Sequence, residues 1–195
     1  TQPGVLDLLR NPFALTPGFE GPRQPSGAKP MLDEALGLWV APFVMAAINT
    51  RNVHRSNFLL GQAYGADFVY DEMVLTGPGD QGEAIARHLA STPMMGGEND
   101  PKPGEGPSEA ERASGSYDLL FIGIAADGRQ VRVSVRGDLD PGYGSTAKML
   151  AEAAVCLVKE SPDVPGGVWT PGAAMRGRLI ARLQANAGLS FTVES

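Results

Sequence analysis

A glycine-rich turn leads directly into a helix at residues 140–158, and it gathers side chains that could do chemistry. Ser145 or Thr146 is expected to cap the start of this helix, because a hydroxyl oxygen can accept from the free N–H groups there. Backbone N–H groups around Gly144 could also bind an anion or a carbonyl oxygen, since glycine lets a ligand approach closely. The simpler interpretation of the segment is a capped core helix after a turn.

Tyr143 and Lys148 add a phenol and an ammonium to the same region. A nearby cation lowers the pKa of a phenol, and a general acid at neutral pH needs such a shift. We therefore take Tyr143 as a candidate proton donor and Lys148 as the group that tunes it. Because Tyr143 precedes the helix, the spacing does not place both on one helical face, and Lys148 could instead pair with Glu152.

A second set of polar side chains lies on the helix predicted for residues 42–60, which is otherwise apolar on most sides. Asn49 belongs to a narrow polar stripe, and Arg51 and Arg55 lie one turn apart on another part of the surface. Two guanidinium groups at this spacing could hold a carboxylate or a phosphate. We predict substrate contacts from these three residues; the alternative is that the arginines pair with the acidic residues 71–72 or face solvent.

Other kinds of catalytic site are not indicated. No Gly-x-Gly-x-x-Gly follows a strand and no Gly-x-x-x-x-Gly-Lys-Ser/Thr occurs, so no nucleotide phosphate loop is recognised. Without a Gly-x-Ser-x-Gly elbow, hydrolysis by a nucleophile is not expected. The single Cys156 excludes an internal disulfide and, among apolar neighbours, predicts a buried thiol. His54 and His88 are too few for a histidine metal centre.

The elements that must position these side chains mix helices with strands. Alternating strands on either side of Asp127-Gly128 predict a β-hairpin. Before residue 92, the other predicted elements are a short helix near residues 5–9, a helix over 42–60, a strand and a further helix. After the hairpin, the predicted elements are a helix over 145–159, a helix over 171–185 and a strand over 189–193. The fold class is therefore α+β (mixed α/β), with a mixed, largely antiparallel sheet packed against helices and no Rossmann nucleotide fold.

Composition limits what the whole chain can do. With 195 residues, 43% of them hydrophobic, it can bury a sizeable core. The net charge of −6 argues against a nucleic-acid partner, for which clustered basic side chains are typical. No apolar run is long enough for a transmembrane segment and no secretory signal pattern is present, so we expect a cytoplasmic protein.

Residues 96–115 are predicted to form a flexible insertion. They combine prolines and glycines with acidic side chains and contain no large apolar residue. A flexible loop is one interpretation, and a mobile lid over a pocket is the other.

Two long segments of the chain resemble a known family. The first, WVAPFVMAAINTRNVHRSN, runs over residues 39–57 and is followed by residues 63–70; the second begins DPGYGSTAKMLAE at residue 140 and continues through GGVWTP to residue 175. Together they resemble the C-terminal part of saccharopine dehydrogenase-like oxidoreductases, in particular the actinobacterial trans-acting enoyl reductase group.

This resemblance implies one part of a two-part enzyme. In the family, an N-terminal Rossmann domain binds NADP or NAD, and a C-terminal α/β domain contacts the substrate and often self-associates. Residues 1–36 would then be an irregular connecting segment from a missing cofactor domain, and 37–195 a substrate-binding and dimerisation domain that binds no cofactor itself. The implied partners are a small-molecule or carrier-bound acyl substrate and a second copy of the chain. The implied reaction reduces a carbon–carbon double bond during polyketide and lipid assembly.

The resemblance also implies roles for the candidate residues. Tyr143, or N–H groups around residues 144–146, would stabilise negative charge on the substrate carbonyl oxygen. Arg51 and Arg55 would hold a phosphopantetheine phosphate or an acidic carrier surface, whereas saccharopine-type substrates would need carboxylate clamps from these arginines and Arg136.

A competing interpretation is a non-catalytic module that docks a synthase or carrier protein or forms a dimer. An apolar surface patch would favour docking. A deep pocket lined by Asn49, Arg51 and Tyr143 would favour catalysis.

Overall fold

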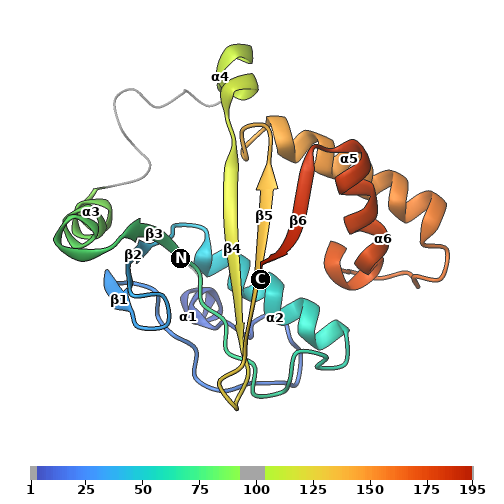
Figure 1. Cartoon of the computed structure of the whole chain (residues 1–195). Helices are drawn as coiled ribbons and strands as arrows, with labels where there is room; N and C mark the ends of the chain where they lie inside the picture. Colours follow the sequence, from blue (N-terminus) through green and yellow to red (C-terminus); the bar gives the residue numbers. More distant parts are fainter. Residues whose placement is uncertain (1–3, 93–103, 195) are drawn as a thin grey trace. The chain divides into compact units, whose positions relative to one another are not determined.

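A computed structural model describes residues 4–92 and 104–194. The chain divides into two compact units, Thr1–Asp100 and Pro101–Ser195. The described residues form six helices and two three-stranded antiparallel sheets (Figure 1). The predicted α+β class is confirmed, and no Rossmann fold occurs in the described ranges. None of the described helices is both long enough and apolar enough to cross a membrane.

The first unit combines a small sheet with three helices. Its elements are α1 (Val5–Arg10), β1 (Met31–Asp33), β2 (Leu38–Pro42), α2 (Ala46–Leu59), β3 (Met73–Gly77) and α3 (Gly79–Ser91). The strand order is β1-β2-β3, and α3 packs against this sheet. Helix α2 instead contacts the irregular segment that joins α1 to β1, through a ring contact of 4.5 Å between the centroids of Phe13 and His54.

The predicted start of the helix over 42–60 is wrong. Pro42 is the last residue of β2, opposite Met73 of β3, and the helix begins only at Ala46. Extended pairing buries Val40 and Ala41 against the rest of the unit, and this burial outweighs the local preference of proline for a first helical turn. The predicted end is confirmed, because Gly61 has a φ of +69° just after the helix.

The second unit packs two long helices on one face of a sheet. Its elements are α4 (Glu109–Ser114), β4 (Tyr117–Ile124), β5 (Gln130–Gly137), α5 (Gly144–Glu160), α6 (Pro171–Asn186) and β6 (Leu189–Glu194), with strand order β4-β5-β6. Val135 and Leu189 from the sheet meet Leu183 and Ala187 from α6 and the end of that helix. Cys156 is fully buried in a neighbouring cluster, as predicted.

The predicted hairpin is confirmed, since β4 and β5 pair in register on either side of Asp127 and Gly128. Of the predicted insertion at 96–115, residues 96–103 lie outside the described residues. The remainder contains α4, which begins with a capping box: Ser108 accepts from the Glu111 N–H while the Glu111 carboxylate accepts from the Ser108 N–H.

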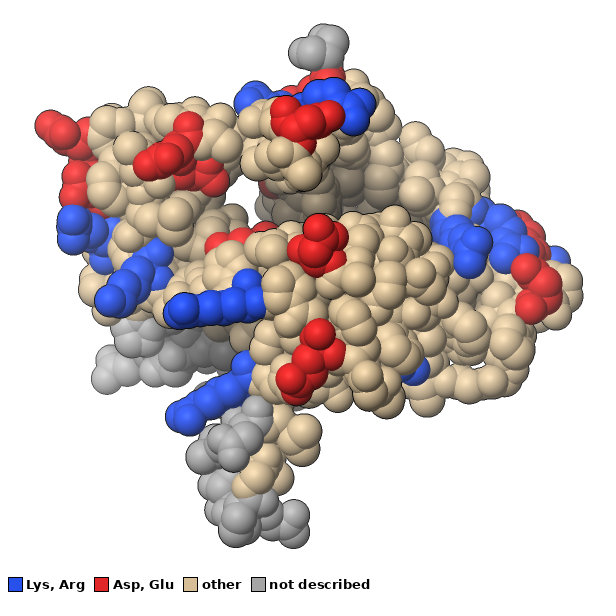
Figure 2. Space-filling view, turned by 90° about the horizontal axis from the view of Figure 1, so that it is seen from below, with Lys and Arg blue, Asp and Glu red and all other residues tan. Residues whose placement is uncertain are grey.

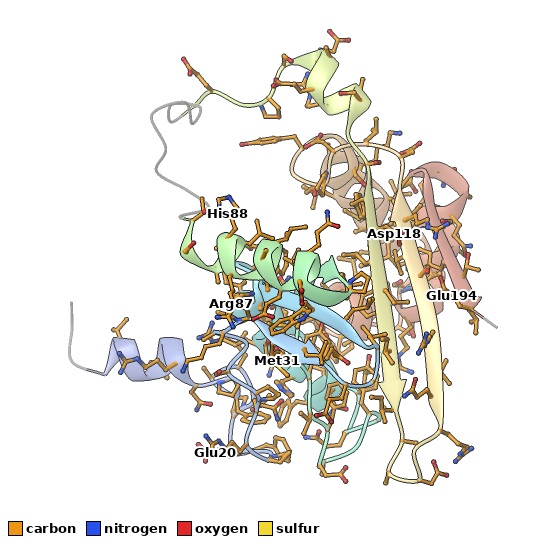
Figure 3. All side chains as sticks on the ribbon, turned by 60° about the vertical axis from the view of Figure 1, so that its left-hand side comes forward. Glu20, Met31, Arg87, His88, Asp118 and Glu194 are labelled. Carbon is orange, nitrogen blue, oxygen red and sulfur yellow. The ribbon has the colours of Figure 1, made fainter. Side chains whose placement is uncertain are left out.

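Charged side chains of both signs occur on the face seen in the space-filling view (Figure 2). On the face drawn in Figure 2, acidic and basic side chains form small separate groups with uncharged surface between them. On the second sheet, Arg136 donates to Asp118 at 2.7 Å across β4 and β5, and Ser134 donates to Glu194 of β6 (Asp118 and Glu194 are labelled in Figure 3). Arg136, a candidate clamp under the saccharopine interpretation, is thus part of an exposed ion pair.

Candidate functional site

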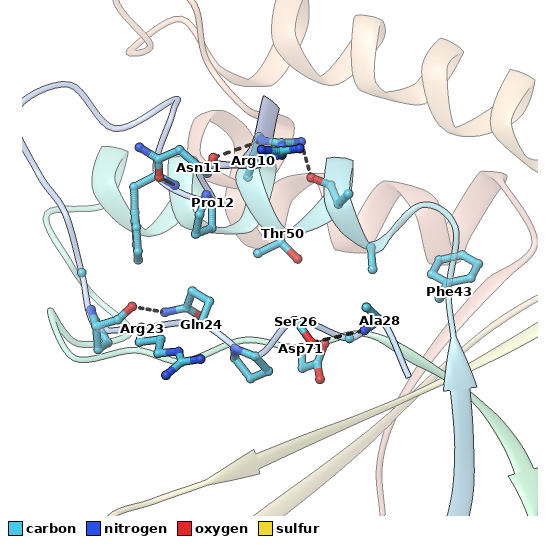
Figure 4. A pocket seen from close by; sticks show the side chains of 18 of the residues that line it. Arg10, Asn11, Pro12, Arg23, Gln24, Ser26, Ala28, Phe43, Thr50 and Asp71 are labelled. Carbon is cyan, nitrogen blue, oxygen red and sulfur yellow. Dashed lines mark hydrogen bonds between the residues drawn. The ribbon is translucent and has the colours of Figure 1, made fainter. Parts of the chain in front are cut away.

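A cavity of about 790 Å³ lies in the first unit, between the irregular segment of residues 10–28 and the first half of α2 (Figure 4). Thr50 lies on the α2 side of this cavity, with Arg23 and Asp71 opposite. Small-molecule sites in proteins commonly have volumes of about 300–1,000 Å³. The cavity is therefore large enough for a ligand of substrate size.

Two arginines of α2 hold the irregular segment in place. The Arg51 guanidinium donates from Nε to the Asn11 carbonyl at 3.2 Å, and Arg55 donates to the Leu15 carbonyl at 3.1 Å. Arg51 also donates to the Ala47 carbonyl within its own helix. These contacts give the arginines a positioning role. The sequence analysis expected either substrate contacts or pairing with acidic residues and solvent exposure, and neither interpretation included this role.

His54 lies between the two arginines in the sequence and faces the same segment. Its ring is 3% exposed and sits against Phe13, and it also meets Phe68 edge-on at 5.8 Å between centroids. Burial lowers the pKa of His54, and among the described residues its Nε2 atom has no hydrogen-bond partner. A neutral imidazole in an aromatic cluster therefore anchors Phe13 to α2.

The lining of the cavity combines charge with a stiff apolar wall. Arg10, Arg23 and Arg51 contribute guanidinium groups, and Glu20 and Asp71 contribute carboxylates. The apolar part of the wall includes four prolines and two phenylalanines, namely Pro12, Phe13, Pro22, Pro25, Pro42 and Phe43. Such a lining can bind a ligand that carries both an anionic group and an apolar body.

The close approach of chain segments at this wall depends on Gly21. A Cβ atom at this position would lie 2.6 Å from the Phe13 ring, which is closer than carbon atoms pack. Glycine there lets the segment fold back over Phe13 and form one side of the cavity.

Among the predicted substrate contacts of α2, Arg51 lines this cavity, whereas Asn49 and Arg55 are not part of its lining. Asn49 donates from its amide to Glu72 at 3.2 Å. Burial and, next, the negative charge of Glu72 raise the pKa of Tyr70 to about 12. Asn49 therefore belongs to a polar cluster with Glu72 and Tyr70.

The prediction that Ser145 or Thr146 caps α5 is wrong. The helix begins at Gly144, and the Asp140 carboxylate accepts from the N–H groups of residues 142, 143 and 144 at 3.0, 2.9 and 2.5 Å. Ser145 is fully buried with its hydroxyl 2.8 Å from that of Tyr117, and Thr146 donates to the Pro141 carbonyl. A carboxylate offers two acceptor oxygens, so one aspartate satisfies several helix-start donors.

Asp140 occupies two of the backbone donors that were considered for a substrate oxygen. Gly144 donates to the Asp140 carboxylate, and Ser145 donates from its N–H to the Asp140 carbonyl at 2.9 Å. The hydrogen bond from the Tyr143 N–H is the main reason that the pKa of Asp140 is lowered. A substrate oxygen would have to replace this carboxylate.

Tyr143 and Lys148 are both exposed, and Tyr143 has 58% of its surface accessible. No hydrogen bond joins them in the part of the chain that the structure describes. They belong to the second unit together with residues 144–146, whereas the three predicted contacts of α2 belong to the first. Their catalytic roles stay predictions.

Sequence reasoning did not identify Arg10 and Arg23 as site residues. Both lie within residues 1–36, which were interpreted as a connecting segment. No periodic pattern there marks one face of a helix or strand. The only signal between them was the density of prolines and glycines, which indicated an irregular path of the chain. For metals, the described residues contain no group of three or more histidine, cysteine, aspartate or glutamate side chains that could hold an ion.

Comparisons with known proteins give relatives over nearly the whole chain. A Mycobacterium tuberculosis (strain H37Rv) protein that carries the provisional name trans-acting enoyl reductase is 34% identical over 216 residues, covering 97% of this chain and 51% of the relative. A trans-acting enoyl reductase of the same strain is 30% identical, covering 94% and 50%. One from Mycobacterium ulcerans is 29% identical, again covering 94% and 50%.

The chain thus spans about half the length of the curated relatives it matches. No protein-family model matches the chain, and no solved structure does. The relatives support the predicted resemblance to the trans-acting enoyl reductase group.

Proposed function

We propose that this chain is the substrate-binding portion of a nicotinamide-dependent trans-acting enoyl reductase of the saccharopine dehydrogenase-like type. The substrate would be a carrier-bound or free acyl chain of polyketide or lipid assembly, and NADP or NAD would bind to a part of the enzyme outside this chain. The observation that carries the proposal is similarity to proteins named trans-acting enoyl reductases over 94–97% of the chain.

The cavity of the first unit is the proposed place for the acyl substrate. Its proline-rich wall would contact the chain of the substrate, and Arg51 would face the polar end. In the reaction, hydride adds to one alkene carbon and a proton to the other, with negative charge developing on the carbonyl oxygen between these events. Tyr143, which belongs to the second unit, is kept as the candidate proton donor.

Arg51 and Arg55 provide a matched pair for testing this assignment. Each donates to a backbone carbonyl of the irregular segment, but only Arg51 lines the cavity. A trans-2-decenoyl phosphopantetheine thioester is titrated into the chain and its Arg51→Ala and Arg55→Ala variants by calorimetry. We expect Arg51→Ala to weaken binding about tenfold, because it removes a charged donor of the cavity, and Arg55→Ala to weaken binding clearly less, because it removes only a contact that holds the irregular segment.

Equal losses of affinity in both variants would mean that Arg51 affects binding only by holding the irregular segment in place. No binding of the thioester to the unchanged chain would remove the proposal that this cavity holds the acyl substrate.

A docking or dimerisation module is the second candidate, and one observation favours it. Helix α5 exposes a row of apolar side chains, with Leu150 at 70% and Val158 at 80% of their surface. Exposed apolar patches on proteins often mark contact sites. If the thioester does not bind while sedimentation equilibrium detects a dimer that a Leu150→Glu variant abolishes, the docking function is the correct one.

A further inference from the structure

Two arginines of the first unit make no hydrogen bond or ion pair among the described residues. They are Arg10, at the end of α1, and Arg23, in the irregular segment, and both line the cavity. The other arginines of this unit are engaged: Arg51 and Arg55 donate to backbone carbonyls, and Arg87 pairs with a glutamate one turn away. The cavity is thus lined by the two arginines of the unit for which the described residues 4–92 supply no partner.

The acidic residues of the lining do not neutralise these groups. Asp71 accepts from the Glu72 N–H at 2.8 Å, and neither Asp71 nor Glu20 forms an ion pair with an arginine of the cavity. Three arginines and two acids leave a formal charge of 3 − 2 = +1 at the lining. A positive, concave site with free planar donors attracts an oxyanion.

The cavity is larger than a simple anion. Its volume of about 790 Å³ far exceeds that of one phosphate or carboxylate group. Arg23 lies toward the end that holds Asn11 and Pro12, whereas Phe43 and Ala28 lie at the other end (Figure 4). A ligand that fills the cavity therefore has an oxyanion at one end and an apolar body beside the phenylalanine.

We propose that the cavity binds an anionic amphiphile, whose phosphate or carboxylate head group is held by Arg10 and Arg23 and whose apolar stem packs toward Phe43. This inference deepens the proposed function and rests on it for the claim that the ligand is a substrate of the reductase. The binding itself needs neither nicotinamide nor turnover, so it is tested separately.

Three probes of equal chain length separate the head group from the stem. Decyl phosphate, decanoate and decanol are titrated by calorimetry into the whole 195-residue chain, below the micelle-forming concentrations of the two anions and below the solubility limit of decanol. Both anions are expected to bind at least about tenfold more tightly than decanol, and more weakly as NaCl is raised. The tighter of the two anions identifies the head group as a phosphate or a carboxylate.

The variants test which side chains hold the head group. Arg10→Gln combined with Arg23→Gln should weaken the binding of the anions about tenfold or more and leave decanol unchanged. Arg87→Gln removes the same type of charge from α3 of the same unit (Figure 3). Arg87 is not among the residues that line the cavity, so this variant should leave the affinities for all three probes unchanged. Thermal denaturation of each variant checks that the fold is intact, which is expected because neither Arg10 nor Arg23 has a partner in the part of the chain that the structure describes.

Equal affinity for all three probes would overturn the proposal, because the cavity would then select only the apolar stem. The same loss of affinity in Arg87→Gln as in the double variant would also overturn it, since a general charge effect would explain the result. If the anions bind as expected and the complete enzyme shows no enoyl reduction, the binding site stands and the proposed function fails.

Discussion

At the scale of single residues, the two tyrosines near the start of α5 have opposite surroundings. The Tyr117 hydroxyl lies 2.8 Å from the buried Ser145 hydroxyl, whereas Tyr143 is largely exposed. Tyr117→Phe should lower the free energy of unfolding by about 1 kcal/mol, because it leaves the Ser145 hydroxyl without its partner. Tyr143→Phe should change it by less than about 0.5 kcal/mol. Urea denaturation measures both, and a larger loss for Tyr143→Phe would contradict this description of α5.

His54 gives the first unit a predictable dependence on pH. Burial lowers the pKa of its imidazole from the usual 6.5, so the unfolded chain takes up a proton at a higher pH than the folded chain. The folded state is therefore favoured above pH 6.5, and this contribution is lost as the pH falls below that value. Comparing the unfolding free energy of the original chain with that of His54→Phe, which keeps an aromatic ring, should isolate this dependence.

The other histidine provides the control. His88 is exposed on α3, and His88→Gln should leave the pH dependence as it is in the original chain (Figure 3). If His88→Gln removes the acid sensitivity and His54→Phe retains it, the role assigned to the buried imidazole is wrong.

At the scale of elements, the start of α5 depends on a residue that precedes it by four positions. The Asp140 carboxylate accepts from three successive N–H groups, while Thr146 makes one contact to the Pro141 carbonyl. Asp140→Ala should therefore lower the melting temperature clearly more than Thr146→Val. Circular dichroism on heating gives both values. Equal effects would indicate that the threonine shares the capping role predicted for it.

Some elements could be predicted because their signals are local. The turn at Asp127-Gly128 and the proline at the first position of α6 each mark a boundary within a few residues. The start of α2 could not be predicted from local signals. Pairing between β2 and β3 decides the conformation of Pro42, and the paired residues are some thirty positions apart in the sequence.

The candidate site was predictable only in part for the same reason. Helical spacing singled out Arg51, which does line the cavity. Arg10 and Arg23 both line the cavity only because of the path of the irregular segment, which the contacts from Arg51, His54 and Arg55 fix. A path held by such long-range contacts leaves no periodic pattern in the sequence.

At the scale of the whole molecule, the proposed reduction has to be tested in a complete reductase. In a complete reductase that contains this chain, Tyr143→Phe should lower kcat by about 10²-fold or more. The KM for the enoyl thioester should change little, because the phenol acts as proton donor. NADPH oxidation followed at 340 nm measures both, and an unchanged kcat would remove Tyr143 from the mechanism.

The separation of substrate binding from cofactor binding is the central claim, and calorimetric titration of NADPH and NADH tests it most directly. The titration is run on this chain and, in parallel, on the full-length Mycobacterium tuberculosis relative that is 34% identical to it. We predict binding to the relative and none to this chain. Tight binding of either nucleotide to the chain alone would contradict the account, because it would place a nicotinamide site within these 195 residues.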